Sequence, residues 1–340
     1  MSRPRRDLSV FKKDLAELME NDFPSGAENE IFHDMLFNIG RLREEKLDIL
    51  ELRLLNTAFA ELRYALKVFK PYRSVPKAAV FGSARLKANH PDFKLARNFG
   101  KKLAQKGWMI ITGGASGIME AAMIGAGAKN SFGLNIMLPF EQQANETIRG
   151  NAKLIYFKYF FTRKLIFLKE SQATVLFPGG FGTFDEGFES GTLVQTGKAR
   201  PRPLVLVDTP KSIFWKSLLS FLKNNMQRGG LISPADLSLM RHVRDADEAV
   251  REVTGFYKNY DSSRFLRDQY LIRLKRPVSD AVLKTINARF RDILSGGVFE
   301  RLDDLHEDDN QGPLLHRIAF NFDRSNYARL RQLIDYLNTF

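Results

Sequence analysis

The ten residues from Phe177 to Glu186, FPGGFGTFDE, combine two kinds of chemistry at one place in the chain. Glycines let backbone N–H groups approach an anion closely, and a helix that begins at such a turn adds partial positive charge. Asp185 and Glu186 have no obvious part in holding a phosphate, because like charges repel. The segment therefore predicts a reaction beside a phosphate pocket, rather than phosphate binding alone.

Two more glycine turns follow apolar runs, at Gly82-Ser83-Ala84-Arg85 and at Gly113-Gly114-Ala115-Ser116-Gly117. Any one of them is equally well read as a tight turn with close helix packing. None fits the dinucleotide fingerprint G-x-G-x-x-G, and the chain has no G-x-x-x-x-G-K-[ST] phosphate loop. Three turns that can each bind an anion together favour a mononucleotide ligand. An enzyme that uses a nicotinamide or flavin cofactor is disfavoured, and so is an NTPase.

The turns punctuate an alternation of strands and helices that begins at Lys77. Strands are expected at 78–81, 108–112, 133–138, 154–157, 173–177 and 204–207, and helices at 92–105, 118–128, 161–170 and 212–225. This order predicts an α/β fold with a doubly wound, Rossmann-like parallel sheet. Ligands of such sheets bind at the carboxyl ends of the strands, where all three glycine turns lie.

The segments on either side differ from this one in their hydrophobic pattern. The sequence therefore predicts a chain of three parts. Residues 1–75 carry apolar residues at three- and four-residue steps and predict a helical N-terminal extension. Residues 76–259 form the predicted nucleotide-binding catalytic domain. Residues 260–340 predict a small α+β unit in the order β-α-β-β-α. The acidic run Asp303–Asn310 within this unit lacks the spacing of a calcium loop and favours a solvated hairpin.

Net charge is distributed unevenly among these three parts of the chain. The formal net charge is +13, and residues 76–259 hold 26 Lys+Arg against 14 Asp+Glu, an excess of 12. Such a field attracts small anions and equally nucleic acid, although a solvated basic surface accounts for any single lysine. With no cysteine, and five histidines without metal-site spacing, no metal site is expected. The chain shows no apolar run of membrane-spanning length and no signal peptide, so a cytoplasmic location and no membrane partner are expected.

The carboxylates and the nearby Arg163-Lys164 pair each have a plainer interpretation. A carboxylate at a helix start commonly serves the helix dipole, and Glu189 one turn later adds another candidate for that role. Arg163 and Lys164 alone are ordinary surface charges. Their combination with Glu186 suits a phosphorylated sugar, because a guanidinium grips phosphate or ribose while a carboxylate faces the anomeric carbon.

These motifs together resemble one known family, the Lonely Guy phosphoribohydrolases, long described as lysine decarboxylases. Residues 178–186 match its P-G-G-x-G-T-x-x-E signature, and Arg163-Lys164 matches its Arg-Lys pair. Residues 113–119 resemble its G-G-x-x-G-[IL]-M turn, and the matches at 81–85, 138–141 and 192–195 extend the likeness over about residues 77–255. Nothing marks a pyridoxal-phosphate lysine, so the decarboxylase description has no support.

The resemblance implies hydrolysis of the N-glycosidic bond of a nucleoside 5′-monophosphate to free base and ribose 5-phosphate, with no cofactor. Carried over residue by residue, Glu186 and Arg163 are the implied catalytic pair. The implied substrate-binding residues are Gly82, Ser83, Gly113, Gly114, Gly117, Met119, Glu141, Lys164, Gly179, Gly180, Gly182, Thr183 and Thr192.

Substrate choice stays open at this point. Ala115 and the pair Ser190-Gly191 depart from the family pattern near the base pocket, and the chain is longer than the plant members. The greater length favours an AMP nucleosidase of the longer bacterial type. A cytokinin nucleotide phosphoribohydrolase and a non-catalytic nucleotide sensor are the alternatives, and binding of nucleic acid through the basic surface is disfavoured. The family also implies a homo-oligomer, a dimer or larger.

Overall fold

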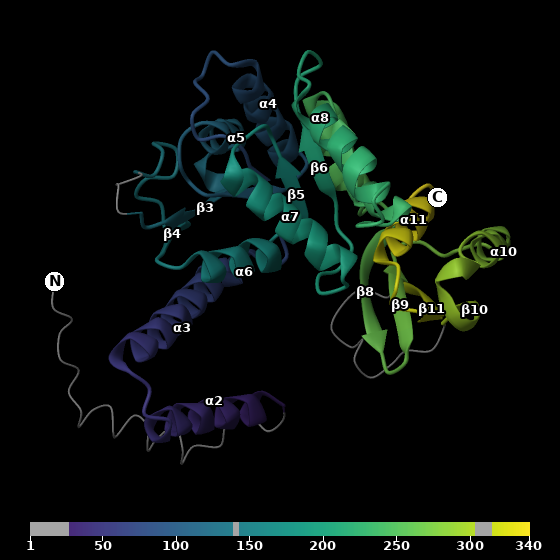
Figure 1. Cartoon of the computed structure of the whole chain (residues 1–340), viewed down its shortest axis with the longest axis horizontal. Coiled ribbons are helices and arrows are strands. Elements are labelled where there is room, and N and C mark those ends of the chain that lie inside the picture. The colour runs from purple at the N-terminus through teal and green to yellow at the C-terminus, as the bar shows by residue number, and fades with distance from the viewer. Residues whose placement is uncertain (1–26, 139–142, 303–314) are drawn as a thin grey trace. The chain divides into compact units, whose positions relative to one another are not determined.

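The computed structural model describes residues 27–138, 143–302 and 315–340 of the 340-residue chain. The chain divides into two compact units, Met1–Phe59 and Ala60–Phe340 (Figure 1). The first unit contributes helix α2 (Ala27–Glu44) and the first half of helix α3 (Ile49–Phe69). This agrees with the predicted helical extension. Among the described residues, no helix is long and apolar enough to cross a membrane.

The second unit is built on a seven-stranded parallel sheet in the order β4-β3-β2-β1-β5-β6-β7. The strands are β1 (Lys77–Phe81), β2 (Met109–Thr112), β3 (Ser131–Ile136), β4 (Leu154–Phe157), β5 (Ala173–Leu176), β6 (Leu204–Val207) and β7 (Met240–Val243). The chain winds outward from β1 in one direction to β4, then returns to β5 on the other side. This reversal confirms the predicted doubly wound fold and places a ligand-binding crevice between β1 and β5.

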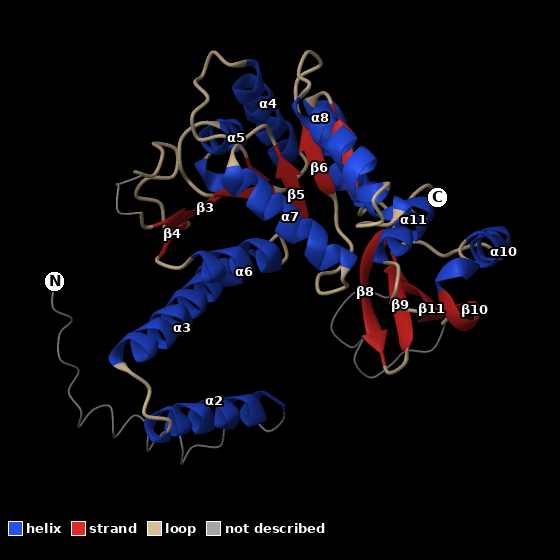
Figure 2. Ribbon diagram, viewed as in Figure 1, coloured by secondary structure: helices blue, strands red, loops and turns tan. Residues whose placement is uncertain are grey.

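Helices cover both faces of the sheet (Figure 2). One face packs against α4 (Pro91–Gln105), α5 (Ile118–Ala126) and α9 (Ala246–Gly255), through buried residues such as Phe99, Ala122 and Val253. The other face packs against the end of α3, α6 (Phe160–Glu170) and α8 (Phe214–Phe221), with Phe69, Phe167 and Trp215 buried. Helix α7 (Phe181–Gln195) lies on this second side, where Phe184 meets Trp215.

A four-stranded antiparallel sheet in the order β10-β11-β9-β8 follows α9. Its elements are β8 (Tyr260–Leu266), β9 (Gln269–Leu274), α10 (Asp280–Arg289), β10 (Leu294–Arg301), β11 (His316–Phe322) and α11 (Tyr327–Leu337). The α+β class of this segment is confirmed, but the predicted order β-α-β-β-α missed β8, whose sequence YDSSRFL is too polar to predict a strand. The acidic run at 303–310 lies outside the described residues.

Helix α11 ties this small sheet to the large one within the second unit. Arg331 on α11 donates to the carbonyl oxygen of Arg202, before β6, and to Glu252 on α9. The two sheets therefore share a buried polar contact. The further division of the chain at residues 75 and 259 stays a prediction.

Candidate functional site

The turns after β1, β2 and β5 meet at the carboxyl edge of the large sheet. The Ser83 N–H donates to the Pro178 carbonyl at 3.0 Å, which joins the turn after β1 to the turn after β5. The Ile118 N–H donates to the Ser83 carbonyl, also at 3.0 Å, which adds the turn after β2. All three predicted glycine turns thus form one backbone-bonded rim.

Some glycines of this rim are required by packing. A Cβ on Gly179 would lie 2.2 Å from Thr183 Oγ1 and 2.8 Å from the Ser83 nitrogen. A Cβ on Gly82 would lie 2.7 Å from the side chain of Ile118. Gly117 has φ of +72°, and a Cβ there would lie 2.2 Å from the Ser83 carbonyl oxygen. Only glycine lets these turns approach so closely.

Two other glycines leave free space instead. A Cβ on Gly180 or Gly182 would meet no described heavy atom within 4 Å. They lie where α7 begins, and the Thr183 and Phe184 N–H groups there donate to the Gly180 carbonyl at 3.0 Å and 3.2 Å. Thr183 is buried beside them. This part of the rim has the features of an anion cradle at a helix N-terminus.

The turn after β2 places two predicted residues, Gly113 and Met119, near Arg163 on α6. A Cβ on Gly113 would lie 2.9 Å from Met119 Sδ and 4.0 Å from Arg163 Nη1. The Gly114 carbonyl accepts from both the backbone N–H and the side-chain amide of Asn145, at 2.8 Å and 3.0 Å. Asn145 is buried, and its two hydrogen bonds hold the turn in place. No sequence pattern predicted this role for Asn145.

Glu186 lies on the second turn of α7 and is only 5% exposed. Its Oε1 atom has no hydrogen-bond partner among the described residues. Burial raises the pKa of Glu186 above its ordinary value, and the charges of Lys164 and Arg163 oppose that rise. A buried carboxylate with an unsatisfied oxygen is costly to maintain unless a ligand uses it.

The cations that face Glu186 come from α6. Arg163 Nη2 lies 3.8 Å and Lys164 Nζ lies 3.5 Å from Glu186 Oε1. Lys164 also bridges Asp185 and Glu189 on α7, each at 2.8 Å. The structure therefore brings the predicted pair Arg163 and Glu186 together, and it assigns Asp185 and Glu189 to Lys164.

Arg163 itself is mostly buried. Its guanidinium lies over the ring of Phe160, 4.8 Å from the centroid, and its Nε has no hydrogen-bond partner among the described residues. Burial lowers the pKa of Arg163, and the charge of Glu186 opposes this shift. At 3.8 Å its contact with Glu186 is electrostatic and leaves both groups hydrogen-bonding capacity for a ligand.

A carboxylate from the predicted N-terminal extension fixes the start of α6. Glu61 on α3 accepts the Lys158 N–H and the Thr162 hydroxyl, both at 2.6 Å. Thr162 directly precedes Arg163, so these hydrogen bonds hold the part of α6 that carries Arg163 and Lys164. Glu61 was missed because one glutamate in a helical pattern carries no signal of its own.

Two predicted residues are not placed with this cluster. Thr192 is exposed and lines a separate cavity of about 110 Å³ with Phe188, Leu222 and Leu239. It follows Glu186 by six residues on one helix, which turns it to another face of α7. Glu141 lies outside the described residues. Within the described residues, no group of three or more His, Asp or Glu side chains is arranged to hold a metal ion.

The geometry fits a defined kind of chemistry. A buried carboxylate flanked by two cations lies beside the N-terminus of α7, at the switch point of the sheet. The carboxylate can stabilise a developing positive charge and orient a water molecule. The cations can orient an anionic sugar, and the open rim can hold its phosphate.

Comparison with known proteins gives relatives of the central segment. Residues 117–253 match the family model described as "possible lysine decarboxylase". A "cytokinin riboside 5′-monophosphate phosphoribohydrolase" of Mycobacterium tuberculosis is 29% identical over 162 residues, covering 46% of this chain and 83% of that protein. A protein of Oryza sativa subsp. japonica, named as a "probable" enzyme of the same activity, is 27% identical over 191 residues, covering 54% and 77%.

Solved structures also match this region. A molybdenum cofactor binding protein from the phototrophic bacterium Rippkaea orientalis is 19% identical with a TM-score of 0.38, and covers 53% of this chain and 96% of that one. A molybdenum cofactor carrier protein from Chlamydomonas reinhardtii is 23% identical with a TM-score of 0.38 and the same coverage.

Proposed function

This chain belongs to the Lonely Guy family, and from that premise we propose that it is a phosphoribohydrolase of nucleoside 5′-monophosphates. Its substrate of choice is AMP, which it would cleave to adenine and ribose 5-phosphate. The observation that carries the proposal is the buried Glu186 carboxylate, 3.8 Å from Arg163 and adjacent to the open glycine rim.

The proposed reaction breaks the bond between C1′ of the ribose and the base nitrogen. Glu186 stabilises the positive charge that develops at C1′ and orients the attacking water, as a carboxylate does in glycoside hydrolysis. The water oxygen bonds to C1′ and gives up its proton, and the base leaves with the bonding electron pair and takes up a proton. Arg163 holds Glu186 ionised and orients the ribose.

The phosphate would lie against the start of α7. Gly180, Gly182 and Thr183 supply the backbone there, and Ser83 and the turn at Gly113 complete the rim. The helix N-terminus favours the negative charge of the phosphate. The remaining predicted contacts are Gly82, Gly114, Gly117, Met119, Lys164 and Gly179, which shape the rim, while Glu141 and Thr192 have no support from the described geometry.

One assay tests the proposal directly. Purified protein is incubated with AMP, GMP, CMP and an N6-isopentenyl adenosine monophosphate, and free base is separated by chromatography. Release of adenine with the highest kcat/KM on AMP supports it. A nucleotide that binds without any base release would identify a non-catalytic sensor instead.

The names of the two relatives favour a cytokinin nucleotide as the second candidate substrate. The chain differs from the family pattern at Ala115, Ser190 and Gly191. Gly191 lines the separate cavity beside Thr192, and Ser190 is buried against Thr174, so these differences give no reason to prefer either substrate. The assay separates the two substrates by their kcat/KM ratio, since a pocket built for a bulky N6 substituent gains binding from it.

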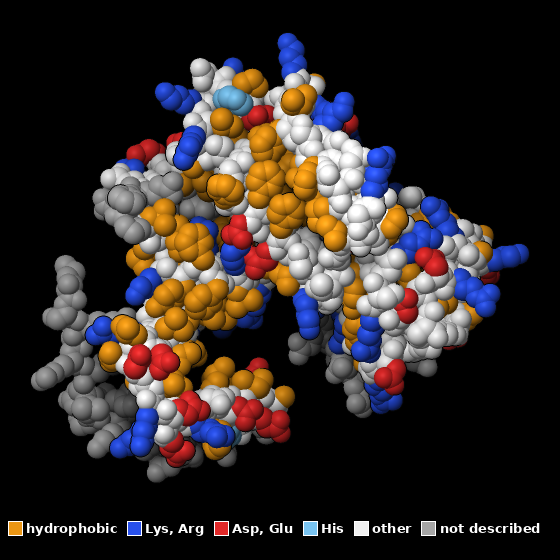
Figure 3. Space-filling view, viewed as in Figure 1, with side chains coloured by type: hydrophobic (Ala, Val, Ile, Leu, Met, Phe, Trp, Pro, Cys, Tyr) orange, Lys and Arg blue, Asp and Glu red, His pale blue; other side chains and the backbone are white. Residues whose placement is uncertain are grey.

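A homo-oligomer is also part of the proposal. Exposed apolar side chains on α6, α7 and α8 include Phe160, Phe161, Leu165, Phe188 and Phe221. Figure 3 shows hydrophobic side chains gathered on one face of the second unit. Exposed apolar patches of this kind mark association surfaces. Light scattering on the full chain should give the mass of a dimer or larger. Steep loss of binding to DNA or RNA with rising salt would instead indicate a polyanion partner.

A further inference from the structure

A second cavity, of about 540 Å³, lies away from the Glu186 cluster. Helix α6, the loop from α7 to β6 and strand β8 each supply part of its wall. Its volume is in the range of small-molecule sites. The lining has two characters: apolar side chains such as Leu165, Leu168 and Leu193, and a group of cations at Lys198, Arg200 and Arg202.

Arg202 is the unusual member of this lining. It is 6% exposed, and it donates to the Leu168 carbonyl at 2.9 Å and to the Ser171 hydroxyl. Its Nε has no hydrogen-bond partner, and no carboxylate lies within ion-pair distance of it, in the part of the chain that the structure describes. Burial lowers the pKa of Arg202 to about 10, so it stays charged near neutral pH. A buried cation without a counter-ion is expensive.

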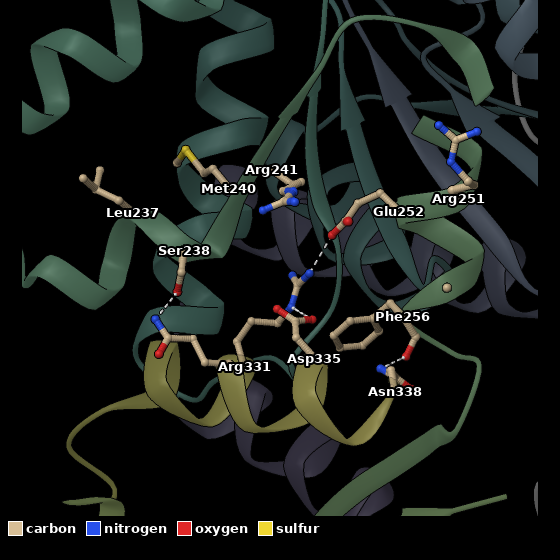
Figure 4. A pocket seen from close by; sticks show the side chains of 12 residues that line it. Leu237, Ser238, Met240, Arg241, Arg251, Glu252, Phe256, Arg331, Asp335 and Asn338 are labelled. Atoms are coloured by element: carbon tan, nitrogen blue, oxygen red, sulfur yellow. Dashed lines mark hydrogen bonds and ion pairs between the residues drawn. The ribbon is translucent and has the colours of Figure 1, made fainter. Parts of the chain in front are cut away.

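A neighbouring cavity shows how this protein neutralises a buried arginine elsewhere. Figure 4 shows Arg331 on α11 pointing between two carboxylates in a cavity of about 490 Å³. It bonds to Glu252 at 2.8 Å and to Asp335 at 2.9 Å. Arg331 and Arg202 are comparably buried, and the Arg331 guanidinium donates to the Arg202 carbonyl at 3.1 Å. Only Arg331 has its charge balanced by protein groups.

The other charges around Arg202 increase the imbalance. Lys198 and Arg200 are exposed, and no ion pair involves either of them among the described residues. Lys169 is neutralised by Glu170 at 2.6 Å. Asp261 is the one acidic side chain in the described lining. Three cations therefore face the cavity against one carboxylate.

We propose that this cavity is a second binding site, which takes a small organic anion: a phosphate or carboxylate group attached to an apolar body. The anionic group would balance Arg202 with Lys198 and Arg200, and the apolar body would contact Leu165 and Leu193. The site shares helices with the Glu186 cluster but none of its charged groups. Leu165 follows Lys164 on α6, and Leu193 lies one turn beyond Glu189 on α7.

Phenyl phosphate is a suitable probe, because it has one anionic and one aromatic end. Its binding to the full chain is followed by calorimetry, and its location by hydrogen–deuterium exchange. The catalytic rim is expected to bind it as well, so location decides the outcome. We expect slower exchange in residues 198–202 and 257–262, in addition to any protection at 178–183.

The variant K198Q/R200Q removes two cations and leaves the Glu186 cluster intact. It should weaken the second binding event by about tenfold or more, since charge-assisted hydrogen bonds are lost. The control K223Q/R228Q makes the same charge change at exposed positions on another surface. Protection confined to the catalytic rim, or equal weakening in both variants, would overturn the proposal. Neither readout depends on base release, so the proposed activity is tested separately.

Discussion

Replacing Glu186 by glutamine removes one negative charge and keeps the shape of the side chain. We expect the Glu186→Gln variant to lose base release from AMP while it stays folded. The carboxylate is buried, and its Oε1 accepts no hydrogen bond in the described chain; its contacts there are the ion pairs with Lys164 at 3.5 Å and Arg163 at 3.8 Å. Its charge is the feature that the proposed reaction uses.

The size of the loss follows from Coulomb's law. A full positive charge about 4 Å from the carboxylate interacts with it by about 4 kcal/mol at an effective dielectric constant of about 20. Arg163 Nη2 lies at a comparable 3.8 Å from the same oxygen, which shows that this spacing exists in the site. A transition state that loses about 4 kcal/mol of stabilisation forms about 10³-fold more slowly. We therefore expect kcat to fall by about 10³-fold.

Glu189→Gln is the matched control, because Glu189 lies one turn along α7 and contacts the same Lys164 at 2.8 Å. It is more exposed and lies away from Arg163, so its removal should lower kcat by less than about tenfold, as for a surface ion pair. Chromatographic release of adenine at saturating AMP gives kcat for wild type and both variants. Equal loss in both variants would refute the reasoning, as would a Glu186→Gln enzyme with wild-type kcat.

Stability provides a second control. A carboxyl group whose pKa is raised by folding contributes stability at low pH, and that contribution is lost as pH rises through the raised pKa. Near neutral pH the charged Glu186 is therefore a cost to the folded protein. Glu186→Gln should have a thermal midpoint equal to or above that of wild type. A large drop in the midpoint would mean that activity was lost through unfolding.

Three further predictions follow from the same contacts. Because burial raises the pKa of Glu186 above its ordinary value, kcat/KM for AMP should fall as pH decreases through that raised pKa, and Glu186→Gln should lack this limb of the profile. Gly179→Ala should lower kcat about 100-fold through displacement of Thr183, whereas Gly182→Ala, which meets no described atom within 4 Å, should raise KM with an unchanged thermal midpoint. Arg331→Met should destabilise the protein by about 1 kcal/mol in a denaturant titration, because Glu252 and Asp335 lose their ion pairs but are 22% and 46% exposed and can be hydrated.

The strands of the large sheet were predictable because they are buried on both faces. Such strands are short apolar runs bounded by glycine turns, as at β1 and β6. Strand β7 was missed, since its sequence MRHV lies at the edge of the sheet and only Val243 is buried. The other edge strand, β4, was predicted because three of its four residues are apolar and buried, so the missing apolar run of β7, rather than its edge position alone, hid it.

The site was predictable where its residues are close in sequence and missed where they are distant. The turn after β5 and Glu186 lie within ten residues, and Arg163 lies on the preceding helix. Glu61 and Asn145 act through contacts 101 and 31 residues away along the chain. No pattern of residue types predicts such pairings. The sequence position of Thr192 already argues against its prediction as a binding residue beside Glu186, because helical geometry turns it to another face of α7.

Three buried arginines show how unsatisfied charge separates structural from functional groups. Arg331 has two carboxylates within 2.9 Å, and its role is to join two sheets. Arg163 lies 3.8 Å from its carboxylate, and both Arg163 Nε and Glu186 Oε1 lack a described partner. Arg202 has no carboxylate at all within ion-pair distance in the described chain. Folding alone gives no reason to keep the last two arrangements, since apolar residues of similar volume would cost less. The ligand that we propose for each site would supply that reason.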